Sequence, residues 1–252
     1  MGTATGLDCV PGIRAHGLLL QEDTQMAEDS GLFLHEEIML LALKDTEGTI
    51  APGTMYQYAI GGAILAELLL RRHIGIAEHG KKKLVEAIDE TPVGDPLIDE
   101  CLERVNTAKR RASLQTWVSR FAGIKGLKHR VARQLCQRGI LQADEDKVLL
   151  LFVRKIYPQM DPEPERQLID RLHDAIFTDR PDIDHRTLVL ASLANSANIL
   201  RVIFDKKELK GRKKRIEEIV NGEVIGKATK EAIEAMQAAI MVAVIMPAMM
   251  HA

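Results

Sequence analysis

The chain has 252 residues, 46% of them hydrophobic, which is enough apolar surface to form a core, so disorder of the whole chain is excluded. Its 34 Lys and Arg residues against 36 Asp and Glu residues give a formal charge of -2, which excludes a uniformly basic nucleic-acid coat. Three cysteines without a CxxC pair argue against structural zinc and favour a reducing compartment.

In chain order, residues 1–30 are predicted to form a flexible N-terminal tail, and residues 31–252 a single domain. Apolar residues at helical spacing then predict five helices between residues 32 and 137. These helices cover residues 32–42, 56–72, 97–105, 113–121 and 127–137. A Gly61-Gly62 pair in the second helix permits close packing or a bend.

Two of these helices are each followed by a predicted hairpin. β-like runs at 73–76 and 84–88 flank a polar turn. The second hairpin is predicted to begin at Ile140, to turn at Asp144–Asp146 and to return over Val148–Val153.

Four more helices are predicted over residues 161–177, 185–204, 207–220 and 229–246, with Asp184 as a cap. The fold class is therefore mainly α, with short β-hairpins. The longest apolar stretch, Ala235–Met250, is interrupted by Gln237 and Pro247 and is shorter than the ~20 residues that a bilayer requires. It is interpreted as a buried closing helix.

Positive charge is concentrated in the middle of the chain, from Arg104 to Arg138, where no Asp or Glu occurs. At about 100° per residue, Leu127, Val131 and Leu135 share one side of the predicted helix, and the cations fan over the other side. Such a face attracts phosphate, although a solvated helix face is the alternative. The ten basic residues are Arg104, Lys109, Arg110, Arg111, Arg120, Lys125, Lys128, Arg130, Arg133 and Arg138.

No sequence motif indicates an enzyme, and no catalytic residue, cofactor or metal site is predicted. The chain lacks a phosphate-binding glycine loop, a zinc-protease helix motif and a nucleophile elbow. Asp182, Asp184 and His185 carry metal-ligand side chains, but Asp184 is better explained as the cap of the helix that follows it.

Six segments resemble, in order, the successive blocks of the Golgi phosphoprotein 3 (GPP34) family, over roughly residues 32–246. They read LFLHEEIMLLALKDTEGTI, GGAILAELLLRRHI, DPLIDECLERV, LQTWV, RVARQLCQRGIL and DHRTLVLASLANSANIL. The resemblance implies a helical core with surrounding amphipathic helices and an apolar β-hairpin. It also implies a non-enzymatic peripheral membrane protein in the cytoplasm, on the cytosolic face of the Golgi in eukaryotes.

The expected ligand is phosphatidylinositol 4-phosphate, an anionic phospholipid, held in a basic pocket. The resemblance further implies an adaptor that retains glycosyltransferases, so membrane-enzyme clients and a homo-oligomer are expected partners. The family's two pocket cations, three residues apart, fall on Lys125 and Lys128. With their neighbours they form the predicted headgroup site: Lys125, Lys128, His129, Arg130 and Arg133.

Other family features are replaced here. The pocket tryptophan falls at Pro52 or Gly53 and the pocket arginine at Gly61, with Tyr56 and Tyr58 as nearby aromatic residues. The arginine-rich N-terminal tail that engages coat protein is also missing, which suggests a divergent member of the family, such as a bacterial one.

The family's membrane hairpin aligns with residues 140–153, and its predicted membrane or oligomer contacts are Leu149, Leu150, Leu151 and Phe152. A run that is apolar at both strand parities is also typical of a buried strand.

Two further readings stay open from the sequence. Each of two helices precedes a hairpin, and one of these helices is basic, as in winged-helix nucleic-acid-binding proteins. A nucleic-acid partner is nevertheless not favoured. The third reading is an interaction scaffold without a lipid role.

Overall fold

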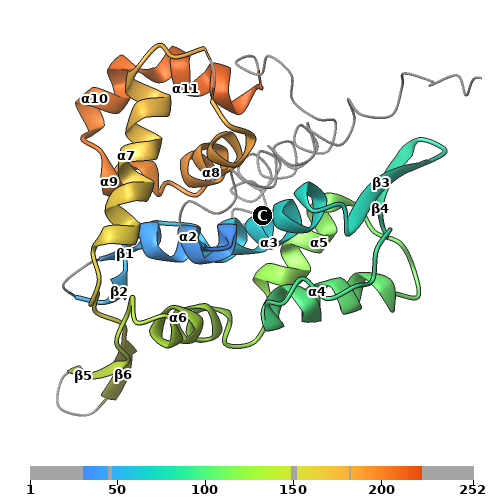
Figure 1. Cartoon of the computed structure of the whole chain (residues 1–252), viewed down its shortest axis with the longest axis horizontal. Coiled ribbons are helices and arrows are strands. Elements are labelled where there is room, and N and C mark those ends of the chain that lie inside the picture. Colours follow the sequence, from blue (N-terminus) through green and yellow to red (C-terminus); the bar gives the residue numbers. More distant parts are fainter. Residues whose placement is uncertain (1–30, 45–46, 149–151, 182, 223–252) are drawn as a thin grey trace, which may run out of the picture. The chain divides into compact units, whose positions relative to one another are not determined.

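The computed structural model of the chain describes residues 31–44, 47–148, 152–181 and 183–222 (Figure 1). The chain divides into two units, Met1–Leu32 and Phe33–Ala252, and all elements below belong to the second. The predicted tail (residues 1–30) and the predicted last helix (residues 229–246) lie outside the described residues.

Three helices form the core: α2 (Leu34–Ala42), α3 (Tyr56–Leu70) and α8 (His185–Ser196), which contact one another. Helix α3 also contacts α5 (Leu114–Ala122), so it is covered on nearly all sides and its sequence has no polar face. A Cβ at Gly61 would lie 2.7 Å from the carbonyl oxygen of Val118 in α5. The glycine pair therefore serves close helix packing, one of its two predicted roles.

The helices around this core are amphipathic, as the resemblance implies. Helices α4 (Pro96–Asn106), α6 (Leu127–Gln137) and α7 (Glu163–Phe177) each bury one side only. Asp95 caps α4 by accepting the Leu97 and Ile98 N–H groups at 2.9 and 2.8 Å. The predicted Asp184 cap is confirmed, since its carboxylate accepts the Thr187 N–H at 2.8 Å.

The strands form three separate antiparallel hairpins, and the mainly α fold class is confirmed. They are β1 (Leu43–Lys44) with β2 (Thr49–Ile50), β3 (Ile74–His79) with β4 (Lys82–Ala87), and β5 (Asp144–Val148) with β6 (Phe152–Ile156).

The hairpin predicted to begin at Ile140 is the third hairpin of the structure, β5 with β6. Its predicted course is wrong, because Asp144–Asp146 belongs to strand β5 instead of forming the turn. Ile140 and Leu141 are buried at the base of the hairpin, where Leu141 bridges Gln159 and the Gln142 N–H donates to the Pro158 carbonyl at 3.0 Å. These contacts fix the register, so the strands beyond them need no apolar run and can carry charged residues.

The last predicted helices are interrupted. The predicted helix over 185–204 divides into α8 and α9 (Leu200–Ile203), because Asn198 between them has a left-handed backbone with φ 61°. The predicted helix over 207–220 is divided at Arg212 into α10 (Lys206–Gly211) and α11 (Lys213–Val220). The Arg212 guanidinium donates to the Ile176 carbonyl at 2.8 Å. Among the described helices, none has the length and apolar character needed to cross a bilayer.

Candidate functional site

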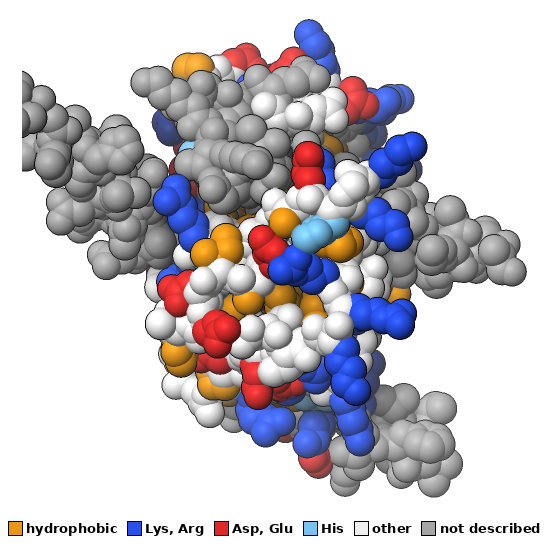
Figure 2. Space-filling model, turned by 90° about the vertical axis from the view of Figure 1, so that its right-hand side faces the viewer, with side chains coloured by type: hydrophobic (Ala, Val, Ile, Leu, Met, Phe, Trp, Pro, Cys, Tyr) orange, Lys and Arg blue, Asp and Glu red, His pale blue; other side chains and the backbone are white. Residues whose placement is uncertain are grey.

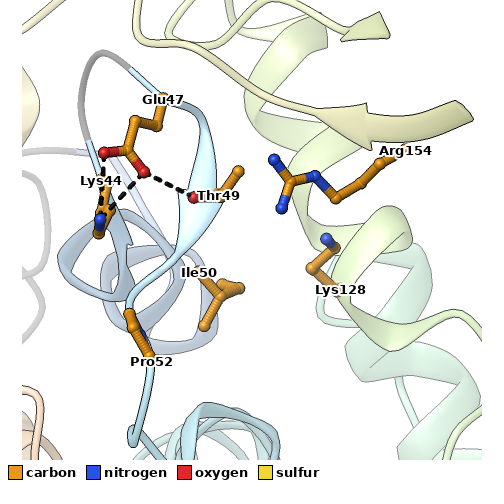
Figure 3. A pocket seen from close by; sticks show the side chains of 7 residues that line it. All are labelled: Lys44, Glu47, Thr49, Ile50, Pro52, Lys128 and Arg154. Atoms are coloured by element: carbon orange, nitrogen blue, oxygen red, sulfur yellow. Dashed lines mark hydrogen bonds and ion pairs between the residues drawn. The ribbon is translucent and has the colours of Figure 1, made fainter. Parts of the chain in front are cut away.

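A basic pocket with a volume of about 450 Å³ lies between the β1–β2 hairpin, α6 and β6 (Figure 3). This volume falls in the range of ~300–1,000 Å³ that is usual for small-molecule sites. The Lys128 ammonium and the Arg154 guanidinium point toward each other, opposite Thr49 and Ile50. The lining residues are Lys44, Glu47, Thr49, Ile50, Pro52, Lys128 and Arg154.

Backbone contacts fasten the β1–β2 turn to the end of β6. Gly48 has φ +57°, and a Cβ on it would lie 2.3 Å from backbone atoms of Tyr157 and Pro158. The Tyr157 N–H donates to the Gly48 carbonyl at 2.8 Å. Only glycine suits this position, because it combines a left-handed backbone with direct contact between two chain segments. The turn that carries Glu47 and Thr49 is thereby fixed.

Helix α6 is attached to the same segment through a side-chain hydrogen bond. His129 Nδ1 lies 2.7 Å from the Tyr157 hydroxyl, and the Tyr157 side chain is buried. The Lys128 Nζ lies 6.0 Å from the centre of that ring. Tyr157 therefore holds all three walls of the basic pocket in place.

Three cations and one carboxylate are among the residues that line the pocket. The Glu47 carboxylate accepts hydrogen bonds from Lys44 Nζ at 3.0 and 3.1 Å, and these bonds help to hold the pKa of Glu47 below its usual value. Burial and, secondarily, the nearby charge of Arg154 lower the pKa of Lys128. An anion between Lys128 and Arg154 would relieve this repulsion, and a phosphate suits a guanidinium fork beside an ammonium.

Of the five predicted headgroup residues, Lys128 is the one found among the described lining residues. Lys125 is exposed in the turn before α6, and Arg133 is exposed on α6. His129 bonds to Tyr157, and burial together with the charges of Lys128, Lys155 and Arg133 lowers its pKa. Arg130 forms an ion pair with Glu100 of α4 at 2.6 Å.

The ten cations of the acid-free run do not all line one pocket. They lie on α4, α5 and α6, in the connections between these helices and, for Arg138, directly after α6. Folding brings carboxylates from outside the run to four of them. Arg104 and Arg130 share Glu100, Arg111 pairs with Glu86 of β4, and Arg138 pairs with Glu36 of α2.

Sequence reasoning missed Arg154 and Lys44. Arg154 stands after the apolar run of the third hairpin, and its neighbour Lys155 makes a basic pair that could have drawn attention. Pro52, one of the two positions where the resemblance places the family tryptophan, lines the pocket. Gly61, where the family arginine falls, faces the backbone of α5 and has no room for a side chain.

The predicted membrane hairpin is only partly described. Leu149, Leu150 and Leu151 lie outside the described residues; Phe152 opens β6, and its side chain is also outside them. Within the described parts of the chain, no group of three or more His, Cys, Asp or Glu residues is arranged to hold a metal ion.

Comparison with known proteins confirms the family resemblance. The family model described as Golgi phosphoprotein 3 (GPP34) matches residues 34–236. Among similar proteins is the vacuolar protein sorting-associated protein 74 of Schizosaccharomyces pombe, which is 25% identical over 236 residues, covering 80% of this chain and 69% of the relative. The chain therefore belongs to the Golgi phosphoprotein 3 (GPP34) family.

Proposed function

We propose that this chain is a peripheral membrane protein that binds phosphatidylinositol 4-phosphate in the basic pocket. The observation that carries the proposal is the pair of cations, Lys128 and Arg154, that lie next to each other on the side of the pocket opposite the β1–β2 hairpin, while Glu47 is engaged by Lys44. A phosphomonoester carries about -1.5 to -2 charges at neutral pH and has three strong acceptor oxygens, so it can accept hydrogen bonds from both cations at once.

In this proposal Arg154 takes over the role of a family arginine that the chain lacks. Position 61 must be glycine because α5 packs directly against it, and a guanidinium cannot reach the pocket from there. Arg154 supplies a guanidinium from β6 instead, and Lys128 keeps the cation of α6. The planar fork of Arg154 can bind two phosphate oxygens, and Lys128 adds a point charge.

The third hairpin supplies the second part of the proposed membrane contact. Arg154 lies on β6 of this hairpin, and Leu149, Leu150 and Leu151 connect its two strands in the sequence. A single weak membrane signal gives only marginal attachment, whereas a headgroup site together with an apolar contact gives stable attachment. We assign the leucines and Phe152 to this apolar contact, or to contact with a second copy.

Family membership supports a proposal for the broader role. We assign the chain a non-enzymatic adaptor role on the cytosolic face of a Golgi-like membrane, with membrane enzymes as its clients. Lys125, Arg130 and Arg133 stay outside the headgroup contact in this assignment, and Lys125 and Arg133 add only general attraction to an anionic surface.

The test is co-sedimentation with phosphatidylcholine vesicles that contain either phosphatidylinositol 4-phosphate or phosphatidylinositol. The double variant Lys128→Met/Arg154→Met is expected to weaken binding to the phosphorylated lipid by about tenfold or more. The matched control is Lys125→Met/Arg133→Met, which removes the same charge from exposed positions and should change binding much less.

Equal losses in both double variants would contradict the pocket assignment and leave only a diffuse basic surface. If the chain instead binds nucleic acid, it should bind a DNA duplex and should not sediment with the vesicles. Tight binding to a DNA duplex with a steep salt dependence, without sedimentation on the vesicles, would favour nucleic-acid binding over the proposal.

A further inference from the structure

A second hollow, with a volume of about 520 Å³, lies between the end of α4, residues 107–113 and α5. The end of α4 and the β3–β4 hairpin point to the side of the molecule that faces the viewer in Figure 2, where Lys and Arg side chains gather along the right-hand and lower edge. We call this second hollow the α4–α5 hollow. Its lining residues are Arg104, Ala108, Lys109, Arg110, Trp117 and Arg120.

Every polar side-chain group that lines this hollow is a hydrogen-bond donor. Four of the lining residues are cations, and the fifth polar one is Trp117, whose indole can only donate. The indole N–H is buried and has no acceptor among the described residues. A hollow whose side chains offer donors without acceptors is suited to a ligand with several acceptor oxygens.

Carboxylates leave most of this charge uncompensated. Arg104 pairs with Glu100 at 2.6 Å, and Glu100 also binds Arg130. The described parts of the chain contain no ion pair of Lys109, Arg110 or Arg120. The hollow therefore differs from a surface on which each cation already has its own carboxylate.

Contacts on both sides hold the hollow in shape. The Val85 N–H of β4 donates to the Ala112 carbonyl at 2.8 Å, and Arg111 pairs with Glu86 of β4 at 3.1 Å. These contacts anchor the segment that carries Lys109 and Arg110. On the other side, the Arg120 guanidinium carbon lies 4.6 Å from the centre of the Trp117 ring, a cation–π contact that restricts the side chain.

We infer that the α4–α5 hollow is a second anion site, which binds a phosphate monoester. Its donors come from two separate segments, with Lys109 and Arg110 on one side and Arg120 on the other, so a tetrahedral group with several oxygens can accept from both. This site is independent of the proposed basic pocket, because the two share no residue. The phosphate belongs either to a lipid headgroup or to a soluble molecule, and both present the same chemistry.

Trp117 provides a direct measurement because it is the only tryptophan of the chain. The full chain is titrated with inorganic phosphate while chloride is reduced to keep the ionic strength constant, and tryptophan emission is recorded. We expect a saturable change, because a bound phosphate draws Arg120 away from the indole ring. The variant Lys109→Ala/Arg110→Ala should raise the apparent Kd roughly tenfold or more.

The variant Lys128→Met/Arg154→Met serves as the control and should leave the titration unchanged, so failure of this site is distinguishable from failure of the basic pocket. A second arm uses phosphatidylcholine vesicles with phosphatidic acid, a lipid phosphate monoester. The same emission change with these vesicles assigns the site to a headgroup, and a response to inorganic phosphate alone assigns it to a soluble ligand.

The inference is overturned if replacing chloride by phosphate at constant ionic strength leaves the emission unchanged. It is likewise overturned if the Lys109→Ala/Arg110→Ala variant gives the same titration curve as the unaltered chain. It is also overturned if that variant lowers thermal stability without any effect of phosphate on either protein. In that case the cations serve only to offset the negative end of the α4 dipole.

Discussion

Arg186 of α8 joins two buried carboxylates of the core, and its removal is predicted to destabilise the fold strongly. Its guanidinium lies 3.3 Å from Glu37 of α2 and 3.1 Å from Glu67 of α3. The side chains of Glu37 and Glu67 are 0% and 2% exposed, so water cannot replace the lost partner. Glu67 also accepts the Leu34 N–H at 3.0 Å, which ties the start of α2 to this group.

The variant Arg186→Met keeps much of the volume and removes the charge. Removal of one partner from a buried ion pair costs about 3–5 kcal/mol. Because Glu67 keeps Arg71 at 2.8 Å and Glu37 keeps Arg171 at 3.0 Å, the loss should lie toward the lower end of this range. For a domain of this size each kcal/mol corresponds to about 2–4 °C, so the melting temperature should fall by roughly 6–20 °C. Urea unfolding followed by circular dichroism measures the free energy directly.

The pH dependence of this loss tests the reasoning further. Burial alone would raise the pKa of Glu67, but Arg186 and Arg71 outweigh it and hold the pKa below its ordinary value of 4.5. In the unaltered chain this group therefore stabilises the fold above pH 4.5, and the stabilisation fades as the pH falls. Without Arg186, Glu67 keeps Arg71 at 2.8 Å but loses the larger of its two opposing charges, so its pKa rises and protonation relieves the buried charge at a higher pH than in the unaltered chain. The stability gap between the two proteins should narrow between pH 7 and pH 4.

The matched control is Arg180→Met, which removes an arginine from an exposed pair with Asp174 and should cost less than about 1 kcal/mol. The reasoning is refuted if Arg186→Met costs no more than this control, or if the gap between Arg186→Met and the unaltered chain stays constant with pH.

Three further predictions concern single positions. Gly48→Ala should lower the unfolding free energy by at least about 1 kcal/mol and weaken vesicle binding, since it pushes the β1–β2 turn away from Tyr157; unchanged binding would contradict the role of this turn. Asp184→Ala should cost about 1 kcal/mol in urea unfolding, because the Thr187 N–H loses its acceptor, and Asp184→Asn should restore most of it. Burial raises the pKa of Cys101 to about 12, so iodoacetamide at pH 8 should label it only in urea, as peptide mass spectrometry would detect.

Local patterns predicted most of the helices because their causes are local. Helix α6 was predicted over residues 127–137 and has these bounds, since its apolar stripe is regular and Gly126 and Gly139 both adopt left-handed backbone at its ends. The break at Asn198 was missed, because a non-glycine residue in that conformation leaves no regular signal in the sequence.

The site could be predicted only in part because it depends on contacts between distant segments. Lys128 stood out as part of a basic helix, but Arg154 reaches the pocket through the register of the third hairpin, which the contacts of Ile140 and Leu141 determine. The absence of acids between Arg104 and Arg138 was misleading for the same reason. Glu36, Glu86 and Glu100 come from outside that stretch and neutralise several of its cations in space.

The most direct test of the proposed ligand site is a crystal structure of the full chain grown with inositol 1,4-bisphosphate, the soluble form of the lipid headgroup. Our account predicts phosphate density within about 2.7–2.9 Å of both Lys128 Nζ and the Arg154 guanidinium. Density beside Lys125 alone, density only in the α4–α5 hollow, or an empty basic pocket at saturating ligand would contradict it.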